Sequence, residues 1–175
     1  PADCQSLLRA CYKHLNMDYK VEATPLAGFN ATPAEIPVLY FSGGRSLNFT
    51  DAERETLRRY LLAGGMVWFD SVVGSPYFYK SALTELSRTL PEAQIRRLPE
   101  DHPLLHMVDD TVKLSTKTKQ EMLPVLDAVH IGSRVAAVVS PYGLGAGWDN
   151  TAPELIKQAD YYDAPSALRL GMNLV

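Results

Sequence analysis

The 175-residue chain has little cysteine, no long apolar run and no marked excess of either charge. Cys4 and Cys11 belong to one expected helix, which separates their Cα atoms by roughly 10 Å and excludes a disulfide between them. Because no 18-residue apolar run and no basic-then-apolar leader is present, we expect no membrane insertion by this segment. The 17 basic and 20 acidic residues give a net charge of -3, which argues against a nucleic-acid partner.

The sequence also lacks the short motifs of several enzyme classes. No G-x-S-x-G pentapeptide is present to place a serine nucleophile on a strand-to-helix turn. Gly143, Gly145 and Gly147 form a glycine-rich loop whose amides could cradle a phosphate, but no helix is expected directly after it and the Lys-Ser/Thr pair of a P-loop is absent. We therefore expect a structural loop with positive φ angles at its glycines, and no bound cofactor.

The most informative segment is residues 50–70. It combines a T-x-x-E capping box at Thr50 and Glu53, a glycine helix stop and an apolar strand that ends at Asp70. An apolar run at residues 36–41 precedes it, so the order is strand, helix, strand with short links, which requires parallel pairing. Ligands usually bind beyond the carboxyl ends of parallel strands, so Asp70 is placed where a ligand could bind or a reaction could take place.

The remaining pattern predicts one α/β domain over residues 1–175, which we expect to be part of a longer protein. We expect further helices at residues 3–15, 76–90 and 164–172. We expect further strands at residues 19–23, 95–98, 125–131 and 134–139. A helical turn is expected at residues 101–106 and an exposed loop at residues 115–121. Gly132-Ser133 is typical of a two-residue hairpin. The predicted fold is a three-layer sandwich with a mainly parallel sheet and one antiparallel edge hairpin.

The candidate binding site gathers the residues that follow the central strands. These residues are Ser42, Gly43, Gly44, Arg45, Asp70, Ser71, Ser140, Tyr142 and Trp148. Asp70 has two interpretations: a general base or ligand contact at the open edge, or a cap for the helix near Pro76 that also holds the loop in shape. The second role is the commoner one for an aspartate after a strand.

His102 and His106 are the candidates for a metal site. Together with Asp109 and Asp110 they have a spacing that could bring two imidazoles to one helical face, and zinc accepts such ligands. No third ligand has motif spacing, and the alternative is that both histidines make local hydrogen bonds around a turn whose leucines are buried. We therefore expect no metal.

Five ordered blocks resemble a known family: YFSGG (residues 40–44), FTDAERETLRRYLLAGGMVWFDS (49–71), LPEDHPLLH (98–106), GSRVAAVVSPYGLGAGW (132–148) and RLGMN (169–173). They are similar to the bacterial domain of unknown function 4159 family. The resemblance implies a flavodoxin-like fold related to class I glutamine amidotransferases, and an extracytoplasmic or membrane-tethered placement as in some members. The chain departs from the family where Ser71 replaces a second aspartate and where a strand before the first helix is missing. The nucleophilic cysteine of true amidotransferases is also absent.

These features favour a non-catalytic α/β domain that binds a small molecule or a protein partner at the carboxyl edge of its sheet. One alternative is a divergent hydrolase or amidotransferase-like enzyme without the standard cysteine triad, which requires a histidine within hydrogen-bond reach of a strand-end serine. Another is a scaffold domain of a membrane-associated assembly, which predicts an exposed apolar patch and no pocket at that edge.

Overall fold

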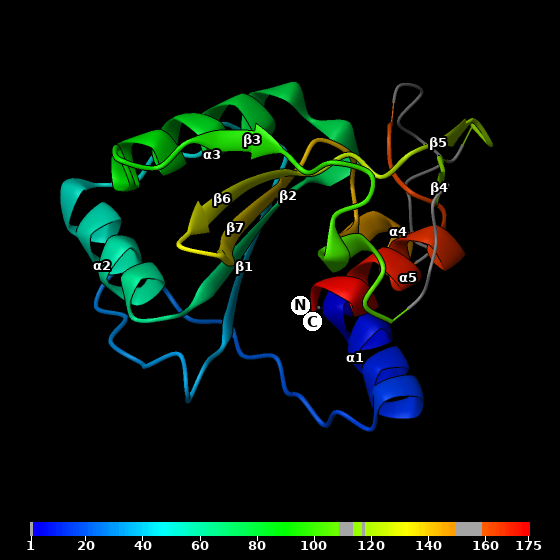
Figure 1. Ribbon diagram of the computed structural model, residues 1–175, viewed down its shortest axis with the longest axis horizontal. Helices are drawn as coiled ribbons and strands as arrows, with labels where there is room; N and C mark the ends of the chain where they lie inside the picture. The colour runs from blue at the N-terminus through cyan, green and yellow to red at the C-terminus, as the bar shows by residue number, and fades with distance from the viewer. Residues whose placement is uncertain (1, 109–113, 117, 150–158) are drawn as a thin grey trace.

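The computed structural model describes residues 2–108, 114–116, 118–149 and 159–175 (Figure 1). Its helices are α1 (Ala2–Leu15), α2 (Asp51–Leu62), α3 (Pro76–Thr89), α4 (Gly145–Asp149) and α5 (Ala164–Leu174), with short 3₁₀ turns η1 (Val72–Gly74) and η2 (Pro103–Leu105). Its strands are β1 (Val38–Gly43), β2 (Met66–Ser71), β3 (Ile95–Arg97), β4 (Leu114–Ser115), β5 (Glu121–Met122), β6 (Asp127–Ile131) and β7 (Arg134–Ser140). All of the expected long helices are present.

Five of these strands form one sheet in the order β1-β2-β7-β6-β3. β1, β2 and β7 pair in parallel, whereas β6 runs antiparallel to both of its neighbours, β7 and β3. The expected mainly parallel sheet is therefore confirmed. The β6–β7 hairpin is also present, but it does not form the edge, because β7 lies beside β2 and β3 pairs outside β6. The last five residues of β7 are buried, which suits an interior strand.

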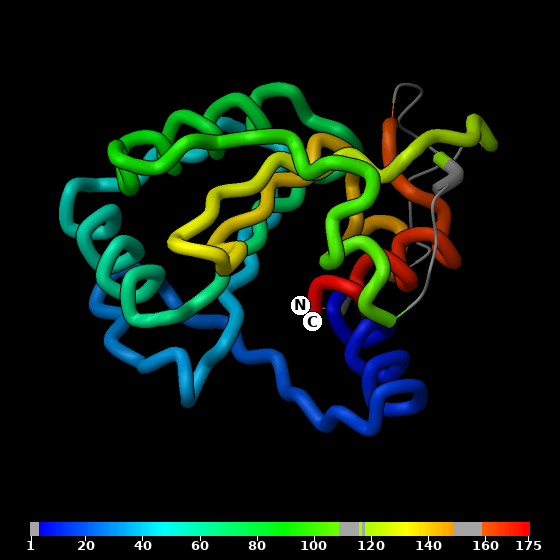
Figure 2. The backbone as a smooth tube through the Cα atoms, in the orientation of Figure 1, coloured from blue at the N-terminus to red at the C-terminus, as the bar shows by residue number. Residues whose placement is uncertain are grey.

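Helices cover both faces of the sheet (Figure 2), and the alternation of side chains along β2 distinguishes the faces. Val67 and Phe69 enter the cluster of buried apolar residues that includes α2 and α3. Trp68 enters the opposite cluster, which includes α1, α4 and α5. Because successive side chains of a strand point to opposite faces, an apolar run such as β2 must be covered on both sides.

The segment around α2 folds as its sequence predicts. The hydroxyl of Thr50 accepts a hydrogen bond from the Glu53 N–H at 3.2 Å, and Glu53 Oε2 accepts one from the Thr50 N–H at 2.8 Å. Gly64 follows the helix with a φ of 112°. The next residue, Gly65, is required by packing, since an added Cβ would lie 2.2 Å from the Tyr60 ring. These contacts lead the chain directly into β2.

Two predictions of local structure are wrong because a strand forms only where a pairing partner lies beside it. Residues 19–23 alternate like a strand but form none, since no described strand lies beside them. Residues 115–121, expected as a loop, include parts of the small antiparallel pair of β4 and β5. A strand needs a neighbour to satisfy its backbone, and sequence pattern alone does not supply one.

The glycine-rich loop also differs from its prediction. A helix, α4, begins at Gly145, and none of the three loop glycines has a positive φ. Gly143 and Gly147 are required by close packing instead: an added Cβ at Gly147 would lie 2.4 Å from the Tyr162 carbonyl oxygen, and one at Gly143 would lie 3.0 Å from the Val73 nitrogen. The loop is therefore pressed against neighbouring chain.

Other expectations concern α1 and the helices as a group. Cys4 and Cys11 on α1 are both buried and form no disulfide, as expected. Within the described ranges, no helix combines the length and the apolar character that a membrane span requires.

Candidate functional site

The carboxyl edge of the sheet brings three of the predicted site residues into one row. The register pairs Ser42 with Asp70 and Asp70 with Ser140. They differ in exposure, since Asp70 and Ser140 are each 1% exposed whereas Ser42 lies on the surface. The interior members of the row are thus closed off from solvent.

Asp70 stabilises the loop that crosses this edge. Its Oδ1 accepts the Leu144 N–H at 2.7 Å, and its Oδ2 accepts the Gly145 N–H at 2.8 Å and the Tyr40 hydroxyl at 2.7 Å. The carboxylate therefore fixes the start of α4 against the end of β2. The interpretation of Asp70 as a loop-stabilising residue is supported, but the prediction that it caps the helix near Pro76 is wrong, because Ser75 caps that helix.

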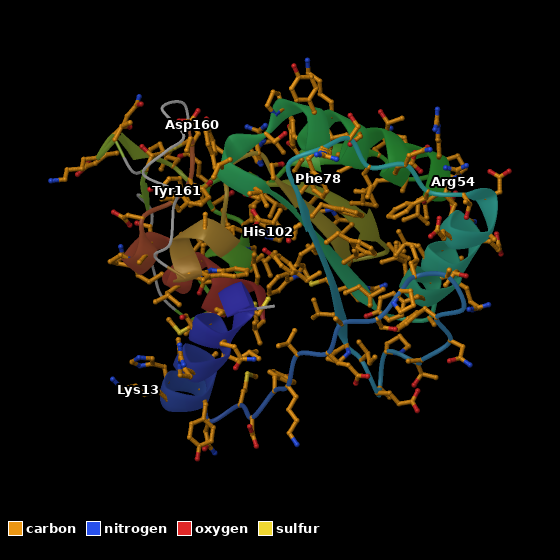
Figure 3. All side chains as sticks on the ribbon, turned by 180° about the vertical axis from the view of Figure 1, so that it is seen from behind. Lys13, Arg54, Phe78, His102, Asp160 and Tyr161 are labelled. Carbon is orange, nitrogen blue, oxygen red and sulfur yellow. The ribbon has the colours of Figure 1, made fainter. Side chains whose placement is uncertain are left out.

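The chain's own residues 159–163 cover the same edge. Gly143 donates its N–H to the Asp160 carbonyl oxygen at 3.1 Å, and Tyr162 donates its N–H to the Gly143 carbonyl oxygen at 3.1 Å. Tyr162 is fully buried, and this burial raises the pKa of its hydroxyl. Asp160 and Tyr161, labelled in Figure 3, belong to this covering segment.

The other predicted residues divide between core and surface. Ser140 Oγ donates to the Tyr142 carbonyl oxygen at 2.6 Å, and Trp148 Nε1 donates to the Ala167 carbonyl oxygen at 2.8 Å. Ser71 is completely buried, and its Oγ has no hydrogen-bond partner in the described part of the chain. Tyr142 is partly exposed. The other exposed or partly exposed members follow one another at the end of β1 and are Ser42, Gly43, Gly44 and Arg45. Ligand binding by these residues stays a prediction.

A second polar cluster lies at this edge and is absent from the sequence prediction. Arg97 Nε donates to Asp127 Oδ1 at 2.7 Å, and the Tyr79 hydroxyl donates to Asp127 Oδ2. Burial, followed by the bond to Asp127, raises the pKa of Tyr79. Asp127 is the first residue of β6, and an antiparallel strand begins where its parallel neighbours end. The predicted hairpin at Gly132-Ser133 could have placed Asp127 at this edge, because a hairpin makes β6 antiparallel to β7.

The histidines make local contacts in the regions that the structure describes. His102 Nδ1 accepts a backbone N–H at 3.2 Å, and His106 Nε2 lies 2.8 Å from a backbone carbonyl oxygen. Burial and then the nearby His130 lower the pKa of His102. No group of three His, Cys, Asp or Glu side chains could hold a metal among the described residues, and Asp109 and Asp110 lie outside them. No hydrogen bond joins a described strand-end serine to an imidazole, so the hydrolase alternative gains no support and stays a prediction.

A cavity of about 660 Å³ lies beside β1, which is one of the two edge strands of the sheet. Its walls include β1, the first half of α1, residues 18–24 and both tryptophans of the chain. The Tyr40 ring is 6.5 Å from the Trp68 ring and 5.6 Å from the Trp148 ring, measured between centroids. Trp68 is 4% exposed, and its Nε1 has no hydrogen-bond partner in the described structure. The cavity therefore combines an aromatic wall with an unused donor.

The chain matches the family model described as Domain of unknown function (DUF4159) over residues 1–175. The chain belongs to this family. No curated protein matches it. Membership of the DUF4159 family confirms the family resemblance, whereas the bacterial origin and the relation to glutamine amidotransferases and flavodoxin stay predictions.

The two regions of this DUF4159 domain differ in what they can do chemically. At the carboxyl edge, most buried polar atoms bond to other parts of the same chain, so their first role is structural. The cavity offers apolar surface, an indole N–H and the edge of the sheet at β1. These groups can make apolar contacts and donate a hydrogen bond.

Proposed function

We propose that this DUF4159 domain is a non-catalytic binding module whose ligand occupies the cavity beside β1. The observation that carries the proposal is the buried Trp68 indole N–H, which lines the cavity and has no acceptor among the described residues. A buried donor without a partner costs roughly 1 to 3 kcal/mol. A ligand that places an acceptor there recovers this cost, and burial of its apolar part adds to the affinity.

The proposed ligand combines an apolar body with a hydrogen-bond acceptor. The cavity volume of about 660 Å³ falls inside the range of roughly 300 to 1,000 Å³ that is typical of ligand sites. The aromatic wall of Tyr40, Trp68 and Trp148 supplies the apolar contact.

The proposed cavity site is continuous with the predicted carboxyl-edge site. Trp148 belongs to both, and Tyr40 connects them because its ring lines the cavity while its hydroxyl bonds Asp70. The exposed residues at the end of β1, Ser42 and Arg45 among them, form the rim in this proposal. A ligand in the cavity would therefore affect the carboxyl edge through the hydrogen bond from the Tyr40 hydroxyl to Asp70.

Calorimetric titration with 1-anilinonaphthalene-8-sulfonate tests this proposal, because the probe has an apolar ring system and a sulfonate acceptor. We expect one molecule to bind per chain. Leu8→Trp, which adds volume at a residue lining the cavity, should weaken binding at least tenfold. Leu62→Trp is the matched control, since Leu62 is 50% exposed on α2 and does not line the cavity. Absence of binding, or equal binding by both variants, would overturn the proposal.

A further inference from the structure

Two histidines from distant parts of the chain lie in contact beside the sheet. His102 directly precedes η2, and His130 lies on β6 at a register shift in its pairing with β7. Their ring centroids are 5.7 Å apart, and the rings are inclined at 65°. Both residues are partly buried. His102 is labelled in Figure 3, and its segment contacts both β6 and α5.

The imidazole of His102 holds the first turn of η2. Leu104 donates its N–H to His102 Nδ1 at 3.2 Å. Because a backbone N–H can only donate, Nδ1 must be unprotonated, and the neutral ring carries its proton on Nε2. A charged imidazole has an N–H at both ring nitrogens and can no longer accept this bond. The cap of η2 and a positive charge on His102 therefore exclude each other.

The turn η2 connects this cap to the core and to the C-terminal helix. Leu105 is 2% exposed and belongs to the buried cluster that includes α1, α4 and α5. Asn173 on α5 donates its side-chain N–H to the Leu105 carbonyl oxygen at 2.7 Å, and its Oδ1 accepts the Val108 N–H at 2.9 Å. Loss of the cap thus acts on a turn that is bonded directly to α5.

The surroundings of the pair favour neutral imidazoles. Burial lowers the pKa of His102, the nearby His130 lowers it further, and Asp101 raises it by a smaller amount. The other charged or titratable residues of the segment 98–106 and of β3, β6, β7 and α5 are Arg96, Arg97, Glu100, His106, Asp127, Arg134 and Arg169. Arginines predominate among them, and Asp127 is already bonded to Arg97. These groups therefore compensate little for positive charge on both rings.

We infer that His102 and His130 form an acid-sensitive switch, which keeps η2 closed against β6 and α5 while both imidazoles are neutral and opens it when they are protonated. The switch is separate from the proposed binding cavity, because neither histidine lines that cavity. In the described part of the chain, no third His, Cys, Asp or Glu joins the pair to make a metal site. The two rings thus act through their charge and through the cap.

Acid favours the open form of this turn. An unfolded histidine titrates near about pH 6.5, and the closed turn holds His102 at a lower pKa. The open form therefore takes up the proton first, so the closed form loses stability as pH falls below about 6.5. Protonation of both rings then places like charges at a contact of 5.7 Å, and this repulsion opposes closure.

Amide hydrogen exchange at about pH 7.5 and about pH 5 tests the switch, with each rate divided by the intrinsic rate at that pH. The protection of the Leu104 and Leu105 amides in the parent chain should fall by about threefold or more at the lower pH. His102→Asn supplies a capping oxygen that does not titrate, so its protection should fall by less than about 1.5-fold. Equal falls in both proteins would overturn the inference.

Nuclear magnetic resonance of the imidazoles separates the switch from a merely structural histidine. The nitrogen shifts of His102 at neutral pH should be those of the Nε2–H tautomer. His130→Gln removes the second ring, so the pKa of His102 should rise when it is titrated in this variant. An Nδ1–H tautomer, or a pKa of His102 that His130→Gln leaves unchanged, would contradict the inference.

Two further variants serve as controls for the exchange experiment. His14 is exposed on α1, so His14→Asn should show the same acid response as the parent chain. His102→Ala lacks both the charge and the acceptor, so its Leu104 amide should be weakly protected at both pH values. Loss of the acid response in His14→Asn would overturn the assignment to His102. Full protection in His102→Ala would show that the imidazole does not hold the turn, and the inference would fail.

Discussion

The carboxyl edge at β2 and the lateral edge at β1 contain similar groups and use them in opposite ways. At the carboxyl edge, the buried Asp70 carboxylate bonds two backbone N–H groups and one hydroxyl of its own chain. At the lateral edge, the indole N–H of Trp68 has no hydrogen-bond partner among the described residues, and β1 pairs with no described strand other than β2. Polar residues at strand ends can thus be structural, and a binding surface is better recognised by groups that the folded chain leaves unsatisfied.

The largest expected effect is the loss of Asp70. Asp70→Ala should lower the free energy of unfolding by about 4 kcal/mol, because it leaves two buried amides and the Tyr40 hydroxyl without their acceptor. Ser42→Ala, at the exposed residue paired with Asp70 in the register, should change it by less than about 0.5 kcal/mol. Urea unfolding followed by circular dichroism measures both. A loss below about 1 kcal/mol for Asp70→Ala would contradict the structural role.

The next effect concerns how tightly the two regions are packed. Gly147→Ala should destabilise the protein by about 2 to 3 kcal/mol, since its Cβ would lie 2.4 Å from the Tyr162 carbonyl oxygen and 2.5 Å from the Ala167 Cβ. Gly44, just after β1, has no atom within 4 Å of an added Cβ. Gly44→Ala should therefore be neutral within about 0.5 kcal/mol in the same unfolding assay. Similar losses for both variants would remove the contrast between a closed and an open region.

Local sequence signals predicted the parts of the fold that are stabilised locally. The capping box of Thr50 and Glu53, the helix stop at Gly64 and the Gly132-Ser133 hairpin involve residues within a few positions of each other, and each is found as expected. The apolar run of β2 also predicted correctly a strand that is buried on both faces, whereas β1 is only partly buried. Such features depend on backbone geometry and periodicity, which are properties of the sequence itself.

The candidate site could be predicted only in part, because its contacts join distant residues. Asp70 was correctly placed at the end of β2, but its partners Leu144 and Gly145 lie in a loop far along the chain. The loop glycines were predicted to have positive φ angles, whereas Gly143 and Gly147 are required because an added Cβ would come too close to neighbouring atoms. The cavity had no sequence signal of its own, since it exists where residues 19–23 find no partner.

The two tryptophans give a smaller and more specific contrast. Trp148 donates to the Ala167 carbonyl oxygen at 2.8 Å, whereas Trp68 donates to no described acceptor. Both are almost fully buried, so each Trp→Phe substitution leaves a similar void. Trp148→Phe should therefore cost about 1 kcal/mol more than Trp68→Phe, the net contribution of one hydrogen bond. Equal costs in urea unfolding would show that the Trp68 N–H has an acceptor after all.

The smallest expected effect is a pH dependence at the entry to β1. Tyr60 is buried under α2, and its hydroxyl donates to the Ile36 carbonyl oxygen at 2.9 Å, just before β1. Burial raises its pKa to about 12. An unfolded tyrosine titrates near pH 10, so the unfolded state releases this proton first and stability is lost as pH rises from about 10 to 12.

Tyr60→Phe isolates this contribution. The free energy of unfolding of the parent chain should fall between about pH 9 and pH 11, and the fall should be about 1 kcal/mol smaller in the variant. Tyr162 at the carboxyl edge also has a raised pKa, so some loss should remain in Tyr60→Phe. Urea unfolding at the two pH values measures the difference. An identical fall in both proteins would mean that Tyr60 is not buried as a neutral hydroxyl, and that the region leading into β1 is more open to water than the region around β2.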